Sequence, residues 1–121
     1  MTVAFDFDGV IHSYISGWKG ADIIPDPPTS GICDVIRELY KSGYEIVVYT
    51  TRAKTSEGTD AVWKYLEAIG INGCISSVTF EKPLAFCYVD DRAIRFDGKT
   101  EGLIEMIISF KAWWEKEKTN G

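Results

Sequence analysis

The sequence predicts a doubly wound α/β fold, a parallel sheet with helices on both faces, in a single domain that spans residues 1–121. Two observations predict it. Strand-like runs alternate with helical segments along the chain, which implies parallel strands joined by right-handed crossovers. The chain has 121 residues, of which 45% are hydrophobic, so it is long enough for one core and too short for two.

The first half of the chain contains two predicted strands and the helix between them. Residues 2–7 form an apolar run typical of a buried strand. The breaker-rich stretch "PDPPTSG" leads into a helix that ends near Gly43, a residue type that commonly caps helices. Residues 44–50, "YEIVVYT", are rich in β-branched and aromatic residues and predict the second strand. The inward stripe of the helix is Ile32, Val35, Ile36, Leu39 and Tyr40.

The second half continues the alternation of helices and strands. A helix is expected over about 56–69, followed by a short strand near 75–79 and a buried strand over 84–89. A brief last strand is expected over 94–96, and a C-terminal helix over 100–118. The inward residues are Val62, Leu66 and Ile69 in the first of these helices, and Leu103, Ile107, Phe110 and Trp114 in the second.

Composition and charge exclude several classes of protein. The formal net charge is -5, whereas surfaces that bind nucleic acid by bulk electrostatics are strongly basic. No apolar run approaches the ~20 residues needed to cross a bilayer, and the N-terminus lacks the features of a secretion signal. Cys33, Cys74 and Cys87 lie far apart among apolar residues, which favours reduced, buried thiols. We therefore expect a cytoplasmic protein that binds neither bulk nucleic acid nor a membrane.

Polar residues follow the major strands at the ends where ligands bind in such sheets. These residues are Asp6, Asp8, Thr50, Thr51, Lys82, Asp90 and Asp91. A strand repeats every two residues, so Asp6 and Asp8 point the same way, and two carboxylates that close repel each other unless something lies between them. A metal ion or a shared proton would relieve this repulsion. The sequence thus predicts a site with chemical function at this edge.

The segments "DFDGV", "VVYTT", "EKP" and "YVDDR" resemble, in this order, the four motifs of the haloacid dehalogenase superfamily, and the resemblance covers residues 3–91. It implies a three-layer Rossmann-like sheet with strand order 3-2-1-4-5 and magnesium-dependent phosphotransfer. The segments after the first motif and before the third are too short for a cap domain, so the chain resembles a small capless phosphatase. Its "VDDR" and the arginine after the second motif also resemble the phosphatase domains of polynucleotide kinases.

The resemblance implies a role for each matching residue. Asp6 looks like the nucleophile that forms an aspartyl phosphate, and Asp8 looks like the general acid and then the general base. Thr50 and Lys82 match the residues that hold the phosphoryl oxygens. Magnesium would be held by Asp6, the backbone carbonyl of Asp8, Asp90 and waters. Because Asp8 must carry a proton to act as an acid, we expect its environment to raise its pKa.

Several assignments stay open at the level of sequence. Thr51 could replace Thr50, and Lys54 could replace Lys82, which must be presented by a loop. Asp91 is a further candidate metal ligand beside Asp90. Arginines that flank the second and fourth motifs, Arg52, Arg92 and Arg95, are candidates for binding a second phosphate or carboxylate, with Arg52 counted among the phosphate-binding residues. A flap after the first strand, residues 10–22, with Tyr14 and Trp18, is expected to cover the site.

These inferences favour a magnesium-dependent phosphomonoester phosphatase. Its expected substrate is a phosphorylated small molecule, with a nucleotide or the phosphorylated end of a polynucleotide as the alternative, and assembly into a homo-oligomer stays open. A non-catalytic phosphoryl-binding module, or a receiver-like signalling domain, is the alternative from another class. A receiver carries its phosphoacceptor after the third strand, where this chain offers no aspartate.

Overall fold

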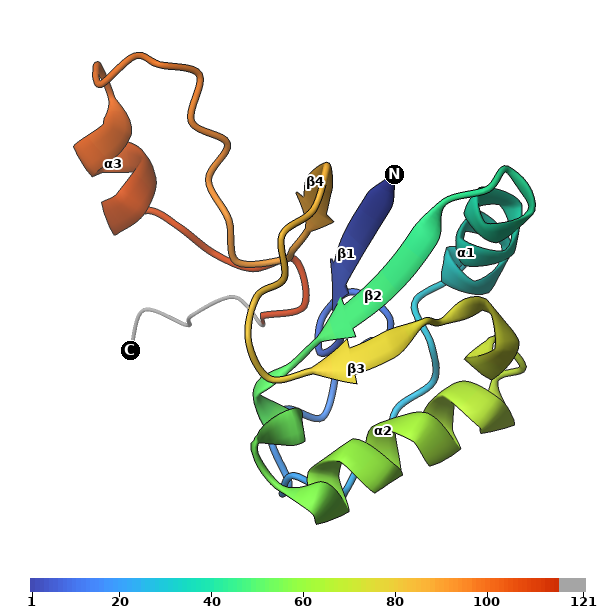
Figure 1. Ribbon diagram of the computed structural model, residues 1–121. Helices are drawn as coiled ribbons and strands as arrows, with labels where there is room; N and C mark the ends of the chain where they lie inside the picture. Colours follow the sequence, from blue (N-terminus) through green and yellow to red (C-terminus); the bar gives the residue numbers. More distant parts are fainter. Residues whose placement is uncertain (116–121) are drawn as a thin grey trace.

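The structure is a computed structural model that describes residues 1–115 (Figure 1). It is an α/β fold with an open sheet of four parallel strands in the order β3-β2-β1-β4. The strands are β1 (Thr2–Asp6), β2 (Glu45–Tyr49), β3 (Ser77–Thr79) and β4 (Cys87–Val89). The α/β class and the parallel sheet confirm the prediction from sequence.

The register of the strands brings their carboxyl ends to one edge of the sheet. Asp6, the last residue of β1, pairs with Tyr49, the last residue of β2. On the other side of β1, Phe5 pairs with Val89 at the end of β4. The turns that follow β1, β2 and β4 therefore start side by side.

Helices α1 (Ile32–Lys41) and α2 (Ser56–Ala68) pack on the same face of the sheet (Figure 1). The core residues that they share with the sheet are Val3, Phe5, Ile46 and Val48 from the strands, Ile36 from α1, and Val62 and Leu66 from α2. The strand residues of this set alternate along β1 and β2, so they lie on one face. The connections from β1 to β2 and from β2 to β3 both lead toward the same edge of the sheet. Right-handed connections that run in one direction place their helices on the same face.

The predicted order 3-2-1-4-5 and the three-layer arrangement are not reproduced in full. Residues 94–96 form no strand, so β4 is an edge strand. Strand β4 is also shorter and more exposed than the buried strand expected over 84–89, and Leu84 is 96% exposed. No helix of the described residues packs on the second face as α1 and α2 pack on the first, which explains this exposure. All three cysteines are free, as expected, but Cys87 in β4 is exposed and Cys33 and Cys74 are only partly buried, contrary to the expectation of buried thiols.

The C-terminal helix is much shorter than predicted. Helix α3 (Leu103–Ile108) has six residues, whereas 100–118 was expected, and residues 116–118 lie outside the described part of the chain. Ile107 and Phe110, predicted to be core, are 58% and 38% exposed, because α3 lies away from the sheet (Figure 1). After α3 the chain returns to the carboxyl edge of the sheet. In the described residues, no helix combines the length and apolarity needed to cross a bilayer.

Candidate active site

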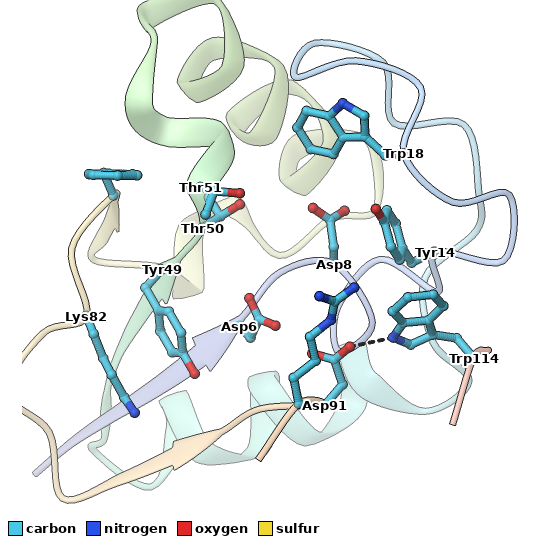
Figure 2. Close-up of a pocket in the computed structure, with 12 residues that line it drawn as sticks. Asp6, Asp8, Tyr14, Trp18, Tyr49, Thr50, Thr51, Lys82, Asp91 and Trp114 are labelled. Atoms are coloured by element: carbon cyan, nitrogen blue, oxygen red, sulfur yellow. Dashed lines mark hydrogen bonds between the residues drawn. The ribbon is translucent and has the colours of Figure 1, made fainter. Parts of the chain in front are cut away.

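A cavity of about 310 Å³ opens at the carboxyl edge of the sheet (Figure 2). Six of the seven polar residues that follow the predicted strands line it together, and only Asp90 of that set does not; the six are Asp6, Asp8, Thr50, Thr51, Lys82 and Asp91. They come from the end of β1 and the turn after it, the end of β2, the loop between β3 and β4, and the turn after β4. The parallel register explains this convergence, since each residue follows a strand that ends at the same edge.

A group of three carboxylates forms one wall of the site. Asp6, Asp90 and Asp91 each offer an oxygen, and these oxygens lie within 4.8 Å of one another. All three side chains are partly buried. Three carboxylates at this separation repel one another strongly unless protons or a cation compensate the charge.

The surroundings of Asp90 and Asp91 hold these two side chains in place. The Tyr49 hydroxyl donates a hydrogen bond of 2.6 Å to Asp90 Oδ2, and the backbone N–H of Arg92 donates one of 2.8 Å to Asp90 Oδ1. The indole N–H of Trp114 donates to Asp91 Oδ2 (Figure 2). The other oxygen of Asp91, Oδ1, is buried without a hydrogen-bond partner among the described residues.

The unpartnered oxygen of Asp91 indicates that this group of residues fits a metal ion. A buried carboxylate oxygen without a donor is costly, and a cation would satisfy it. Hard divalent cations such as Mg²⁺ prefer carboxylate oxygens, with the remaining positions filled by water or substrate oxygens. Asp6, Asp90 and Asp91 thus form a donor set suited to such a cation, and the predicted role of Asp91 as a further ligand agrees with its position.

The titration of Asp6 reflects the same crowding of charge. Burial, together with hydrogen bonding and charge repulsion from Asp91 and the charge of Asp90, raises the pKa of Asp6 from 3.8 to about 9. The backbone N–H of Phe7, which donates a hydrogen bond of 2.9 Å to Asp6 Oδ1, acts in the opposite direction. Without a cation, Asp6 is therefore protonated at neutral pH, and a bound cation would favour its ionised form.

Asp8 lies in a very different environment. Arg52 donates two hydrogen bonds to it, of 2.8 Å from Nε to Oδ2 and 3.1 Å from Nη2 to Oδ1. The ring of His12 adds a hydrogen bond of 2.8 Å between Nδ1 and Oδ1. Burial alone would raise the pKa of Asp8, but the hydrogen bonds from His12 and Arg52 and the charge of Arg52 lower it below 3.8. The expectation of a raised pKa is therefore wrong, because the sequence did not reveal these two donors.

The hydrogen bonds of His12 determine which of its ring nitrogens carries the proton. Nε2 accepts a hydrogen bond of 3.1 Å from the backbone N–H of Asp26, so the proton is on Nδ1, which donates to Asp8. His12 is completely buried and packs against the rings of Phe7 and Tyr65. It is thus a fixed donor that orients Asp8.

Arg52 is not available to bind a substrate phosphate. Its side chain is completely buried, and Nε and Nη2 donate to Asp8. Nη1 donates to the carbonyl oxygens of Gly20 and Ala21 in the flap and of Ile23 just after it. The predicted phosphate-binding role is therefore not supported, and the structure instead gives Arg52 the role of joining the second motif, Asp8 and the flap.

The structure distinguishes the two candidate lysines but leaves both threonines as candidates for the phosphate-binding hydroxyl. Thr50 is buried, and its hydroxyl oxygen accepts a hydrogen bond of 3.2 Å from the backbone N–H of Arg52, which leaves its proton free to donate into the cavity. Thr51 also lines the cavity, so both threonines stay candidates. Lys82 lines the cavity from a loop, whereas Lys54 does not line it and is exposed.

Three features of the site were missed in the sequence. Tyr49 appeared only as a strand residue and Trp114 only as a core residue, yet both donate to carboxylates of the site. Gly9 has a φ of 84°, and a Cβ at this position would overlap the Asp91 carboxylate. The glycine in "DFDGV" is a sequence signal for such a close approach of two segments. The position of Trp114 in the sequence gives no indication that it contacts Asp91.

No protein-family model matches the chain, and the searches of curated proteins and of solved structures found no significant match.

Proposed function

We propose that this protein is a magnesium-dependent phosphomonoester phosphatase of the haloacid dehalogenase type. In this proposal Asp6 attacks phosphorus, and the resulting aspartyl phosphate is then hydrolysed. The observation that supports it best is that Asp6 and Asp91, which form a group of three carboxylates with Asp90, line one cavity with Thr50 and Lys82. Phosphoryl transfer requires both a positioned nucleophile and neutralisation of charge on the phosphoryl oxygens.

The phosphoryl group would lie between Asp6 and the two residues that neutralise it. The free hydroxyl proton of Thr50 can donate to one phosphoryl oxygen, and the Lys82 ammonium can approach another from its loop. The Lys82 Nζ lies 4.2 Å from the centre of the Tyr88 ring, which keeps it at the edge of the cavity. These contacts account for binding and orientation of the phosphoryl group.

Asp6, Asp90 and Asp91 would hold the magnesium ion, together with the backbone carbonyl of Asp8. When bound, the cation offsets the repulsion between the Asp6 carboxylate and the phosphate dianion. Asp6 then forms a bond to phosphorus while the bond from phosphorus to the leaving oxygen breaks. In the second step a water molecule attacks the phosphoryl group, and the Asp6 carboxylate is restored.

The environment of Asp8 suits its proposed role as a base better than its role as an acid. The lowered pKa keeps Asp8 ionised at neutral pH, so it can accept the proton of the attacking water in the second step. A carboxylate in this state is a poor proton donor in the first step. The proposed enzyme should therefore favour substrates whose leaving group needs little protonation.

The test is a magnesium-dependent assay with p-nitrophenyl phosphate, combined with acid quenching and mass spectrometry of the peptide that contains Asp6. We expect turnover with Mg²⁺, none with EDTA, and a loss of at least ~1000-fold in Asp6→Asn, equivalent to ~4 kcal/mol. Asp34→Asn is the matched control, since its side chain is 90% exposed on α1. Retained turnover in folded Asp6→Asn, or binding of phosphate without any turnover, would refute the proposal.

A further inference from the structure

The cavity has two chemically different sides. Figure 2 shows Lys82 and Tyr49 on one side of Asp6, where the Tyr49 hydroxyl donates to Asp90, and Asp8, Tyr14 and Trp114 on the other side, with Trp18 above Asp8. In the proposed reaction, Lys82 binds the phosphoryl oxygens. Because Lys82 occupies the side that would bind the phosphoryl oxygens, the ester group of the substrate would extend to the other side, which holds Asp8 and the aromatic rings.

Trp18 packs against Arg52 and still has about half of its surface exposed at the cavity. Its side chain belongs to the flap, and the residue is 52% exposed although it lines the cavity. The guanidinium of Arg52 lies 4.7 Å from the centre of the Trp18 ring system, and Arg52 also holds the backbone of the flap at Gly20 and Ala21. The ring is thus positioned before any ligand binds, which reduces the entropy lost on binding.

Two further rings complete the aromatic side. Tyr14 and Trp114 pack edge to face with their centres 4.8 Å apart, and the Arg92 guanidinium lies 5.2 Å from the Trp114 ring. Tyr14 is largely buried at 9% exposure and has a φ of 61°, a conformation that a residue with a Cβ seldom adopts. Burial and the contact with Trp114 hold the Tyr14 ring in place beside the cavity.

We propose that the aromatic side of the cavity binds a planar aromatic ring on the leaving group, so that the substrates are small phosphomonoesters that carry such a ring. Flat rings stack on tryptophan and tyrosine faces with little dependence on their identity. The cavity volume of about 310 Å³ lies at the lower end of small-molecule sites and suits a mononucleotide or another small aromatic phosphate. This inference rests on the proposed function, because it takes the orientation of the substrate from the phosphatase reaction.

The experiment measures binding rather than turnover, with two pairs of ligands that differ in the ring. Calorimetry with Asp6→Asn and Mg²⁺ compares adenosine 5'-monophosphate with ribose 5-phosphate, and phosphotyrosine with phosphoserine. We expect the ring to tighten binding at least ~5-fold, the lower end of what one stacked base contributes. A preference in the first pair identifies nucleotides as the ligands, and one in the second pair alone identifies aryl phosphates. Equal affinities within both pairs would overturn the inference.

Variants of Trp18 show whether this ring causes the preference. Trp18→Phe keeps a stacking face and should keep most of the preference. In Trp18→Leu the affinities for the two ligands of a pair should differ by less than ~2-fold. Phe96→Leu is the control, since Phe96 is 60% exposed and does not line the cavity. Loss of the preference in Phe96→Leu, or its full retention in folded Trp18→Leu, would contradict the role of Trp18.

The two proposals fail in different ways. A ring preference in a protein that hydrolyses no phosphomonoester would support the aromatic subsite and refute the phosphatase. Magnesium-dependent turnover without any ring preference would support the phosphatase and refute the subsite.

Discussion

Arg52 holds Asp8 from both sides of its carboxylate, with hydrogen bonds of 2.8 Å and 3.1 Å. The same guanidinium donates three hydrogen bonds to backbone carbonyls in and just after the flap, and Trp18 covers it. One buried side chain therefore connects the charge state of Asp8 with the position of the flap. A change at Arg52 should affect both stability and catalysis.

We expect Arg52→Gln to lower the free energy of unfolding by about 3 kcal/mol. The substitution leaves the carboxylate of Asp8 without its ionic partner, and breaking a buried pair from one side costs about 3–5 kcal/mol. Chemical denaturation measures the change. The exposed Arg95 provides the control variant Arg95→Gln, which should change stability by less than ~0.5 kcal/mol. A loss below ~1 kcal/mol in Arg52→Gln would show that the guanidinium does not have this structural role.

The raised pKa of Asp6 makes the metal-free protein less stable as the pH rises. The folded state keeps the Asp6 proton up to about pH 9, whereas the unfolded chain releases it near the ordinary value of 3.8. The folded state therefore binds more protons between these values, and the stability present below pH ~4 is lost as the pH approaches ~9. The lowered pKa of Asp8 changes the free energy of unfolding only at pH values below this range.

Urea unfolding with EDTA at a series of pH values measures this dependence. Between pH 5 and pH 9, the free energy of unfolding should fall less in Asp6→Asn than in the unaltered protein. In the unaltered protein, Mg²⁺ should restore the stability that is lost near pH 9. Magnesium binding at pH 7 should also release protons, which calorimetry in buffers of different ionisation enthalpy detects. A flat stability profile in the metal-free protein would contradict the crowding of the three carboxylates.

We expect Trp114→Phe to weaken Mg²⁺ binding by roughly 10-fold. Phenylalanine keeps a ring beside Tyr14 but removes the N–H that orients Asp91, and loss of such a partner of a metal ligand typically costs 10–100-fold in affinity. Trp113→Phe is the matched control, because its indole donates to the backbone oxygen of Gly9 instead. Calorimetric titration with Mg²⁺ compares the two variants, and equal affinities would rule out orientation of Asp91 by Trp114.

In Asp8→Asn the second step should slow more than the first. An amide cannot accept the proton of the attacking water, while p-nitrophenolate needs little protonation to leave. The aspartyl phosphate on Asp6 should therefore accumulate after acid quenching, with a larger phosphorylated fraction than in the unaltered protein. Because Asn leaves Arg52 without its charge partner, circular dichroism should first establish that the variant is folded. A phosphorylated fraction that stays equal or falls would argue against a base role for Asp8.

The sequence alone determined β1, β2, α1 and α2, and the edge at which the site forms. The apolar runs of β1 and β2 and the helical spacing in α1 and α2 are local patterns, so they predict these elements directly. Parallel strands end at a common edge, and for that reason Asp6, Thr50 and Asp91 could be grouped before their distances were known. Local patterns failed for α3, where apolar spacing suggested a longer helix that the described residues do not form.

Only the tertiary structure decided how the carboxylates are partnered. Asp8 lies 44 residues from Arg52 in the sequence, and Asp91 lies 23 residues from Trp114, so no spacing rule connects these pairs. A pKa depends on burial and on the few groups within reach of the carboxyl oxygens, which the chain brings together only on folding. This is why two aspartates in the same short motif have opposite shifts, with Asp6 raised beside other carboxylates and Asp8 lowered beside a guanidinium.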